Sequence, residues 1–226
     1  QLHWLGGLGV IVLVVAVLPL LGVGGRQMYK AETPGPMKDD KLTPRMAETA
    51  KGLWRVYIFL TILCIALYWW FGMTLMDAAV HAFSVMGLGG FSSHDASFGW
   101  FHSLPLEIVT VVFALIAGLN FSLHFLAWRG RSLRPYVSDP EIRWYFAYVF
   151  GSCLMLGLFL WARGIYPDFP SALRDASFSV VSMATTLGLS TADFGQWPLF
   201  VGLWLLYLCS FTTSAGSTGG GIKMLR

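Results

Sequence analysis

The segment Asp77–Asp95 occurs a second time as Asp175–Asp193, 98 residues further along the chain and aligned without a gap. The matching positions carry small or polar residues: an aspartate at each end, with alanine, serine and glycine between them. Each copy lies between two long apolar segments and is too short to cross a bilayer itself. Repeated re-entrant segments of this kind build pores in membrane proteins. The repeat therefore predicts two copies of one membrane-embedded unit.

The composition excludes a soluble globule. Hydrophobic residues make up 56% of the 226 residues and charged residues 12%, which leaves too little polar surface for a water-soluble fold. Five apolar segments are long enough, or nearly so, to cross the membrane as helices, so we expect an all-α membrane protein. They are Trp4–Leu21, Leu53–Met76, Phe101–Trp128, Trp144–Trp161 and Trp197–Phe211. The three cysteines lie inside apolar runs, where burial is expected rather than a disulfide or a metal site.

The basic residues predict the orientation. Thirteen of the fifteen lysines and arginines flank the segments 26–55 and 129–143 or end the chain, and only Arg163 and Arg174 lie elsewhere. By the positive-inside rule these loops are cytoplasmic, and residues 72–100 and 162–196 are exterior. The exterior stretches carry five aspartates against two arginines, which would attract cations. A solvated cytoplasmic face is enough to explain the basic loops, so their charge alone indicates neither nucleic acid nor a specific lipid.

Each exterior stretch predicts a half-helix followed by a loop. The half-helices are Asp77–Met86 and Asp175–Thr185, each about 15 Å long, with the aspartate as the expected N-cap. A loop at that depth must be buried in protein or line water, because lipid cannot satisfy its backbone polar groups. The first loop comprises Leu88, Gly89, Gly90, Phe91 and Ser92, and the second loop comprises Thr186, Leu187, Gly188, Leu189 and Ser190.

The glycine that the two loops share allows backbone angles that point carbonyl groups toward a cation. The negative C-terminal end of each half-helix would favour the same cation. The alternative is that Gly90 and Gly188 are ordinary turn or helix-packing glycines. Their equivalent places in the repeat favour an ion filter.

These residues resemble a known family. The order helix, half-helix, glycine-centred loop, helix is similar to that of potassium-channel-like pores. The whole chain, including the loop 31–36, resembles the Trk/Ktr/HKT superfamily of potassium uptake proteins, in particular its TrkH/TrkG type. The motifs that carry this resemblance are Gly-Gly-Phe-Ser-Ser-His-Asp-Ala-Ser at 89–97, Thr-Thr-Leu-Gly-Leu-Ser-Thr at 185–191 and Ser-Ala-Gly-Ser-Thr-Gly-Gly-Gly-Ile-Lys at 214–223.

The resemblance implies four pore repeats around one pseudo-fourfold pore, of which this chain is the central fragment. Residues 1–25 would be the inner helix of a preceding repeat, 53–128 and 144–226 two complete repeats, and 26–52 and 129–143 cytoplasmic loops. It also implies potassium at the Gly90 and Gly188 loops, and a gate below them formed by Gly216, Gly219, Gly220, Gly221 and Lys223. A plain flexible hinge is the alternative for that glycine run, in which each interior glycine costs a helix about 1 kcal/mol.

The function implied is potassium uptake across the bacterial inner membrane, without covalent chemistry. Potassium is then the substrate, and no covalently bound cofactor is expected. The resemblance further implies a cytosolic nucleotide-binding regulatory ring and a homodimer of the full-length subunit, whereas coupling to protons or sodium stays open. The alternative is a membrane-embedded enzyme or scaffold that uses Ser, Thr and His near the surface.

Several other residues invite a functional interpretation. The run Gly216–Lys223 is not a phosphate-binding loop, because Lys223 comes one residue late and Met224 replaces the magnesium-binding Ser or Thr. Glu107 and Asn120 lie within an apolar span, where Glu107 is expected to bond a neighbouring loop. Structural or interfacial roles at helix ends or in loops are expected for the remaining candidates, His81, His94, His102 and His124.

Overall fold

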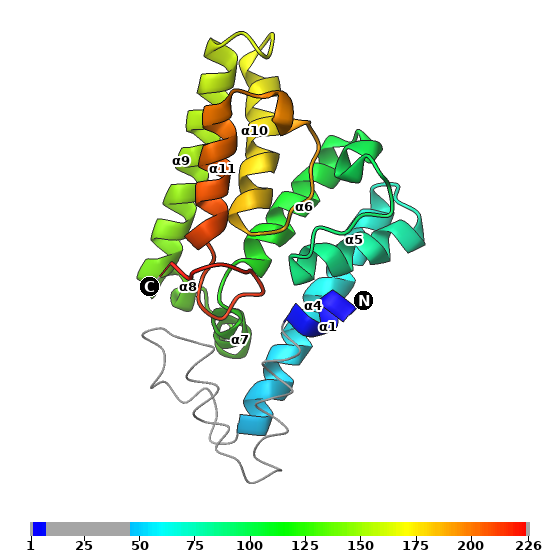
Figure 1. Cartoon of the computed structure of the whole chain (residues 1–226). Coiled ribbons are helices and arrows are strands. Elements are labelled where there is room, and N and C mark those ends of the chain that lie inside the picture. The colour runs from blue at the N-terminus through cyan, green and yellow to red at the C-terminus, as the bar shows by residue number, and fades with distance from the viewer. Residues whose placement is uncertain (1, 8–45, 225–226) are drawn as a thin grey trace.

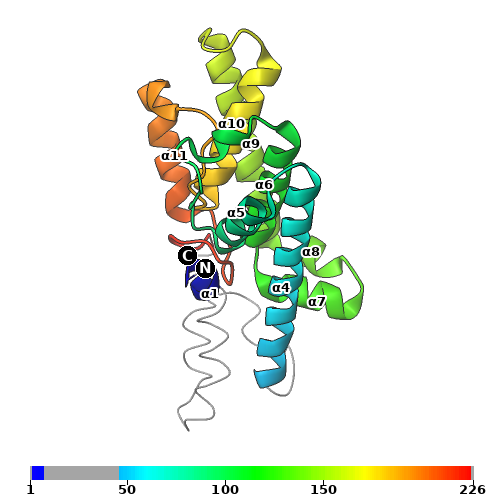
Figure 2. The same ribbon diagram turned by 90° about the vertical axis from the view of Figure 1, so that its right-hand side faces the viewer.

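The computed structural model describes residues 2–7 and 46–224, and within these ranges the chain is helical and contains no strand. The prediction of an all-α protein is therefore confirmed. Two helices are long and apolar enough to cross a membrane, or three if a bent pair counts as one span. Figure 2 shows α4 and α11 on opposite sides of the molecule with α5 between them.

The first repeat begins with the long helix α4 (Met46–Trp70) and continues into the shorter α5 (Leu75–Gly87). The first loop follows α5, and the short η2 (Ser97–Phe101) leads back into α6 (Leu104–Ala117). After a break, α7 (Phe121–Gly130) completes the repeat. α5 packs against α4 on one side and α6 on the other (Figure 1).

The second repeat has the same order. After the short α8 (Arg134–Ser138) come the long α9 (Pro140–Ala162), α10 (Phe169–Ala184), the second loop, η3 (Phe194–Gln196) and α11 (Leu199–Phe211). α10 packs against both α9 and α11, and it also contacts α6 of the first repeat (Figure 1). The short α1 (Leu2–Gly7) packs against α5.

The predicted N-caps of both half-helices are wrong. α5 begins two residues before Asp77, and its cap is Thr74, whose hydroxyl accepts from the Asp77 backbone N–H at 3.1 Å. α10 begins six residues before Asp175 and is capped by Asp168. In both helices an earlier capping residue extends the helix by about one turn or more, which leaves the repeated aspartates inside it.

The predicted single span Phe101–Trp128 is also wrong. It is split into α6 and α7, whose axes meet at 93° across residues 118–120. Asn120 caps α7 by accepting from the Ser122 N–H at 2.9 Å, so this amide has a structural role at the bend. α7 therefore leaves the direction of the span and runs across the end of the bundle. Of the predicted segment Trp4–Leu21 the structure describes only residues 4–7, within α1, and most of the predicted loop 26–52 lies outside the described residues.

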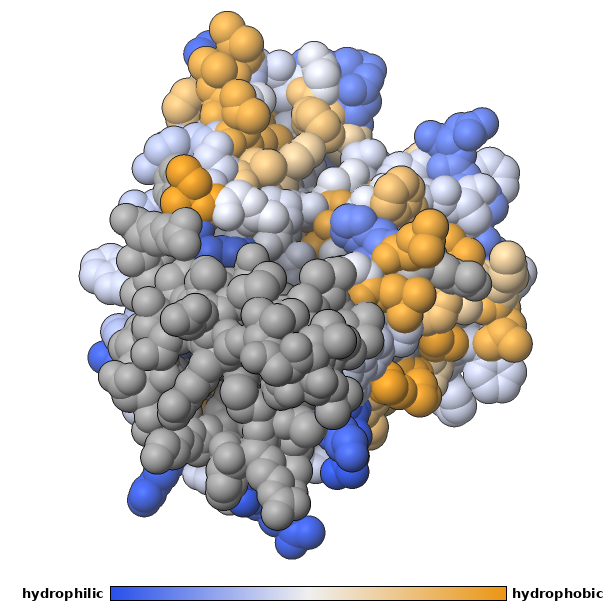
Figure 3. Space-filling view, turned by 60° about the horizontal axis from the view of Figure 1, so that its bottom comes forward, coloured by the Kyte–Doolittle hydropathy of each residue, from blue (hydrophilic) through white to orange (hydrophobic). Residues whose placement is uncertain are grey.

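The interior is closely packed between the two repeats, and the periphery is apolar. Tyr57, Tyr68 and Tyr145 are fully buried, whereas Trp70 and Leu199 are 79% and 78% exposed. In Figure 3, hydrophobic residues gather at the upper left and on the right-hand part of the face, with hydrophilic residues at the lower rim and at the upper right. An apolar outer surface of this extent is typical of contact with lipid.

Candidate functional site

The two loops share one backbone conformation and lie against each other. Leu88 and Thr186, at equivalent places in the repeat, have φ of 52° and 62°, and Gly90 and Gly188 have φ of 70° and 82°. A Cβ built on Gly90 would lie 2.5 Å from the carbonyl oxygen of Leu187, and one built on Gly188 would lie 3.8 Å from the Gly90 Cα. The structure thus brings the two shared glycines together, although they are far apart in the sequence.

Each half-helix ends at its loop, so its negative C-terminal end is directed at the place where the loops meet. Two carbonyl groups of the second loop are engaged within the protein. The hydroxyl of Ser182 donates to the carbonyl of Leu189, and the N–H of Gly99 donates to the carbonyl of Ser190 at 3.0 Å. These two carbonyl groups therefore bind protein donors, whereas the Leu187 carbonyl faces the first loop.

A buried histidine fixes the end of the first loop. His81 lies inside α5 rather than at a helix end, which corrects the expected placement. Its Nδ1 is 2.8 Å from the carbonyl oxygen of Asp77, so Nδ1 carries the proton and Nε2 accepts from the Ser92 hydroxyl at 3.0 Å. A catalytic triad of Ser, His and Asp would need a carboxylate bonded to the imidazole. The Asp77 carboxylate instead accepts from Ser93 and Thr74, both at 2.7 Å, so the histidine holds the loop in place.

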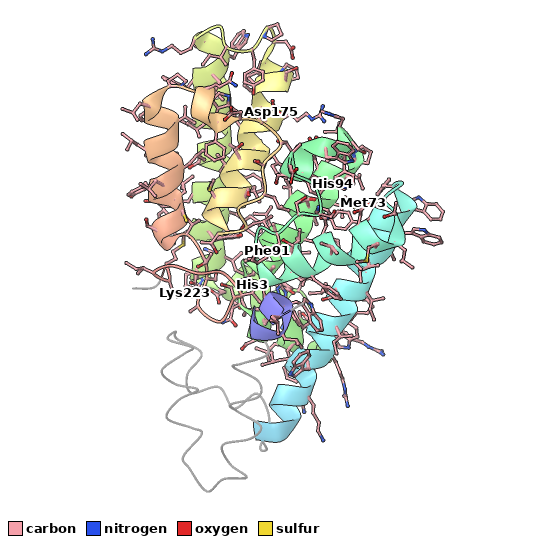
Figure 4. The ribbon with its side chains drawn as sticks, turned by 45° about the vertical axis from the view of Figure 1, so that its right-hand side comes forward. His3, Met73, Phe91, His94, Asp175 and Lys223 are labelled. Atoms are coloured by element: carbon pink, nitrogen blue, oxygen red, sulfur yellow. The ribbon has the colours of Figure 1, made fainter. Side chains whose placement is uncertain are left out.

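The two repeated aspartates lie toward the predicted exterior and are both hydrogen-bonded. His94 Nε2 is 3.5 Å from the Asp77 carboxylate, and the His94 ring stacks on Trp100 with centroids 4.8 Å apart. The hydroxyl of Tyr166 donates to Asp175 at 2.7 Å, and burial together with this bond raises the pKa of Tyr166 above its usual range. Figure 4 shows His94 and Asp175 on the same side of the loop residue Phe91, and His3 and Lys223 on the other side. The two aspartates thus contribute negative charge near the loops, on the side of the predicted exterior.

The residues 212–224, here called the glycine segment, lie below the two loops (Figure 1). The N–H of Gly220 donates to the hydroxyl of Thr186 at 2.8 Å, and the hydroxyl of Thr218 donates to the carbonyl of Met86 at 3.0 Å. The segment is therefore bonded to the second loop and to the end of the first half-helix. Such bonds place it across the inner side of both loops.

The glycine segment is also held by a residue of α9 and by a bond within the segment. The N–H of Ala215 donates to the buried carboxylate of Glu141, at the start of α9, at 3.0 Å, and the ammonium group of Lys223 donates to the carbonyl of Gly219. A Cβ on Gly219 would lie 2.3 Å from the Thr213 side chain, so only glycine fits there without rearrangement. Glu141 was not among the predicted site residues, because no pattern in the sequence connects it to a segment 74 residues away.

The break between α6 and α7 is the counterpart of the glycine segment. The dipeptide Ala117-Gly118 recurs as Ala215-Gly216 with the same spacing of 98 residues, a signal beyond the end of the repeat described above. The break after α6 and the glycine segment are joined by backbone hydrogen bonds. The N–H of Ser214 donates to the carbonyl of Gly118 at 3.1 Å, the N–H of Phe121 to the carbonyl of Gly216 at 3.1 Å, and the N–H of Thr218 to the carbonyl of Ala117 at 3.3 Å. If the comparison of the two repeats had been extended beyond Asp95 and Asp193, this shared dipeptide would have indicated the bend after Gly118.

Glu107 joins the two repeats. It accepts two hydrogen bonds, each 2.6 Å, from the guanidinium group of Arg174, so α6 is tied to α10. The prediction that Glu107 bonds a neighbouring loop is wrong, because Arg174 lies on the helix α10. The geometry is a bidentate ion pair with the glutamate side chain 9% exposed and the arginine side chain 40% exposed. This is a structural contact between repeats rather than an ion site.

Comparison with known proteins identifies relatives over the whole chain. The family model of TrkH, described as a cation transport protein, matches residues 1–226. The Trk system potassium uptake protein TrkH of Salmonella typhimurium is 48% identical over 226 residues, which cover all of this chain and 47% of the relative. The corresponding TrkG of Escherichia coli is 43% identical, with 46% of its length covered.

A solved structure of a relative has the same fold over the whole of this chain. The crystal structure of the potassium transporter TrkH from Vibrio parahaemolyticus superimposes with a TM-score of 0.83 at 43% identity, covering all of this chain and 45% of that one. The chain thus spans about half the length of the relatives that it matches.

Proposed function

Since the chain belongs to the TrkH family of cation transport proteins, we propose that it is the part of a potassium uptake protein that carries two of the pore repeats. The first and second loops would supply two sides of a selectivity filter, with potassium held by backbone carbonyl groups at Gly90 and Gly188. The observation that carries this proposal is that both loops adopt the same positive-φ pattern and meet at these two glycines. Transport of this kind needs no covalent chemistry and no cofactor.

The glycine segment would act as the gate. It is bonded to Thr186 in the second loop and to Met86 below the first loop, so it lies on the path that an ion leaving the loops would take. Lys223 adds a positive charge to the segment and would repel a cation or fix its position. For the gate to open, these bonds must be exchanged for others.

Membership of the TrkH family also supports a proposal about the membrane and the partners of the full-length protein. We place it in the bacterial inner membrane with the basic segments on the cytoplasmic side, as a homodimer with a cytosolic nucleotide-binding ring acting on the gate. The names of the relatives support potassium as the substrate. The enzyme alternative has weaker support, since the His81–Ser92 pair is used to hold the first loop.

The test uses the full-length parent protein. We expect it to restore growth of a potassium-uptake-deficient bacterium at limiting potassium, and to carry potassium in preference to sodium when reconstituted in liposomes. Correctly inserted protein that restores no growth and carries no potassium would overturn the proposal.

A further inference from the structure

Two adjoining cavities open between α4 and α7, at the end of the bundle that the basic residues place in the cytoplasm. One has a volume of 390 Å³ and the other 490 Å³, and both are lined by Val56 and Trp128. Because they share these two lining residues, the cavities are neighbours, and together they are here called the depression. Neither cavity belongs to the loops or to the glycine segment.

The two cavities differ in chemistry. Three basic side chains line the larger cavity: Lys51, Arg55 and Arg129. The smaller cavity is lined mostly by apolar side chains, among them Phe59, Leu60, Leu119 and Ala127, and its wall also contains His124, Arg131, Ser132 and Tyr136. No acidic side chain is among the described residues that line either cavity. The depression is therefore basic at one end and mostly apolar at the other, where Arg131 adds a further positive charge.

The side chains along α4 follow the same change from basic to apolar. Lys51, Arg55 and Phe59 are spaced by four residues and all three are exposed, so they lie along one face of the helix, about 6 Å apart from one to the next. Lys51 begins the apolar span that continues to Trp70. The orientation predicted from the basic residues places the charged end at the level of lipid headgroups, and Phe59 lies about two turns further along α4.

The depression is built into the fold. The ring of Phe125 on α7 sits directly on Gly52 of α4, where a Cβ would come within 2.1 Å of it. Two polar groups in the wall of the apolar cavity are paired with each other, since His124 bonds the Tyr136 hydroxyl at 2.7 Å and the Ile116 carbonyl at 3.0 Å. An apolar chain could therefore pass these two groups without breaking their hydrogen bonds.

Trp128 stands between the two ends. It is 56% exposed and meets Phe59 edge-on with centroids 4.8 Å apart. Because α7 turns away from α6 by 93°, it lies across the end of the bundle that the basic residues place in the cytoplasm. Tryptophan and arginine at helix ends are typical anchors at a membrane surface.

We propose that this depression binds one anionic phospholipid of the cytoplasmic leaflet. The phosphate lies between Lys51 and Arg55, and one acyl chain passes Trp128 into the apolar cavity lined by Phe59 and Ala127. Charge complementarity selects an anionic headgroup, and the apolar continuation selects a lipid over a soluble anion. The inference rests on the membrane orientation and is independent of which ion the pore carries.

The test measures lipid binding to the purified full-length parent by native mass spectrometry during titration with phosphatidylglycerol or phosphatidylcholine. We expect phosphatidylglycerol to bind in preference. Arg55→Gln should weaken its binding about fivefold, the effect of one basic residue near a headgroup. Ala127→Phe fills the apolar end and should weaken it by at least as much with every charge kept.

Arg134→Gln is the matched control, because Arg134 is an exposed arginine on α8, outside both cavities, and should leave binding unchanged. Equal binding of the two lipids, or equal weakening by Arg134→Gln, would overturn the proposal. So would unchanged binding in Ala127→Phe, or displacement of the lipid by millimolar inorganic phosphate. If Arg55→Gln does not fold, Lys51→Gln tests the same charge. Potassium flux measured on the same samples separates a failure here from a failure of the proposed transport.

Discussion

The two shared glycines differ in how much room surrounds them. Both have positive φ, which costs a residue with a Cβ about 1–2 kcal/mol. At Gly90 the added Cβ would also come within 2.5 Å of the Leu187 carbonyl oxygen, whereas at Gly188 its nearest neighbour would be 3.8 Å away. Equivalent positions in the repeat are thus unequal in their tolerance of a side chain.

We predict that Gly90→Ala and Gly188→Ala both lower the preference for potassium over sodium, and that Gly90→Ala has the larger effect because it must also displace a carbonyl of the other loop. The measurement is the ratio of potassium to sodium flux of the full-length parent in liposomes. Gly151→Ala in α9 is the control, since nothing lies within 4 Å of a Cβ there. An unchanged ratio in both loop variants would contradict the filter assignment.

The equivalent residues Ser84 and Ser182 differ in their hydrogen bonding. The hydroxyl of Ser182 donates to the Leu189 carbonyl, whereas the buried hydroxyl of Ser84, its counterpart, has no hydrogen-bond partner among the described residues. Removal of a donor from a buried carbonyl costs about 1–3 kcal/mol. We therefore predict that Ser182→Ala lowers the thermal unfolding midpoint of the full-length parent and that Ser84→Ala leaves it nearly unchanged. Equal midpoints for the two variants would show that the hydroxyl does not support the second loop.

At the scale of elements, the sequence predicted where helices occur better than where they begin or bend. Apolar runs located α4, α9 and α11, because lipid demands such runs. The starts of α5 and α10 were misplaced, since Thr74 and Asp168 can also cap and lie further upstream. The bend after Gly118 was missed because the hydrogen bonds that stabilise it come from residues 214–218, far along the chain.

The positions of the two loops along the chain were predicted correctly, for a local reason. The close approach of Gly90 to the Leu187 carbonyl was not predicted. A glycine between small residues indicates a turn by itself. That Gly90 faces the Leu187 carbonyl follows from the packing of α10 on α6, and the Glu107–Arg174 pair that supports this packing joins residues of different repeats. Such contacts are set by tertiary structure and leave no local pattern.

The bond between α9 and the glycine segment predicts a gating phenotype. Glu141→Ala leaves the Ala215 N–H without its acceptor, at a cost of about 1–3 kcal/mol to the arrangement seen here. We predict that this variant increases basal potassium flux about fivefold or more, whereas Glu141→Gln, whose amide oxygen can accept the same bond, stays closer to the parent. Flux of the reconstituted full-length protein without regulatory partners is the measurement. Equal flux in Glu141→Ala and the parent would remove Glu141 from the gate.

At the scale of the whole molecule, the orientation is testable from both ends. Ser93 lies in the predicted exterior stretch, and Leu133, which is 73% exposed, lies in the cytoplasmic segment between α7 and α8. We predict that an impermeant thiol reagent added to intact cells labels Ser93→Cys and leaves Leu133→Cys unlabelled, on a cysteine-free full-length background. Permeabilised cells, in which both sites should react, are the control. The reverse labelling would invert the orientation and with it the side from which lipid reaches the depression.

The two loops carry different residues around the same backbone, and this has an evolutionary consequence. In an assembly of identical subunits, one codon change alters every side of the pore at once. Here Leu88-Gly89-Gly90-Phe91 and Thr186-Leu187-Gly188-Leu189 are separate parts of one chain, so a mutation in one loop leaves the other unchanged. In the proposed filter, single mutations would then change one side at a time.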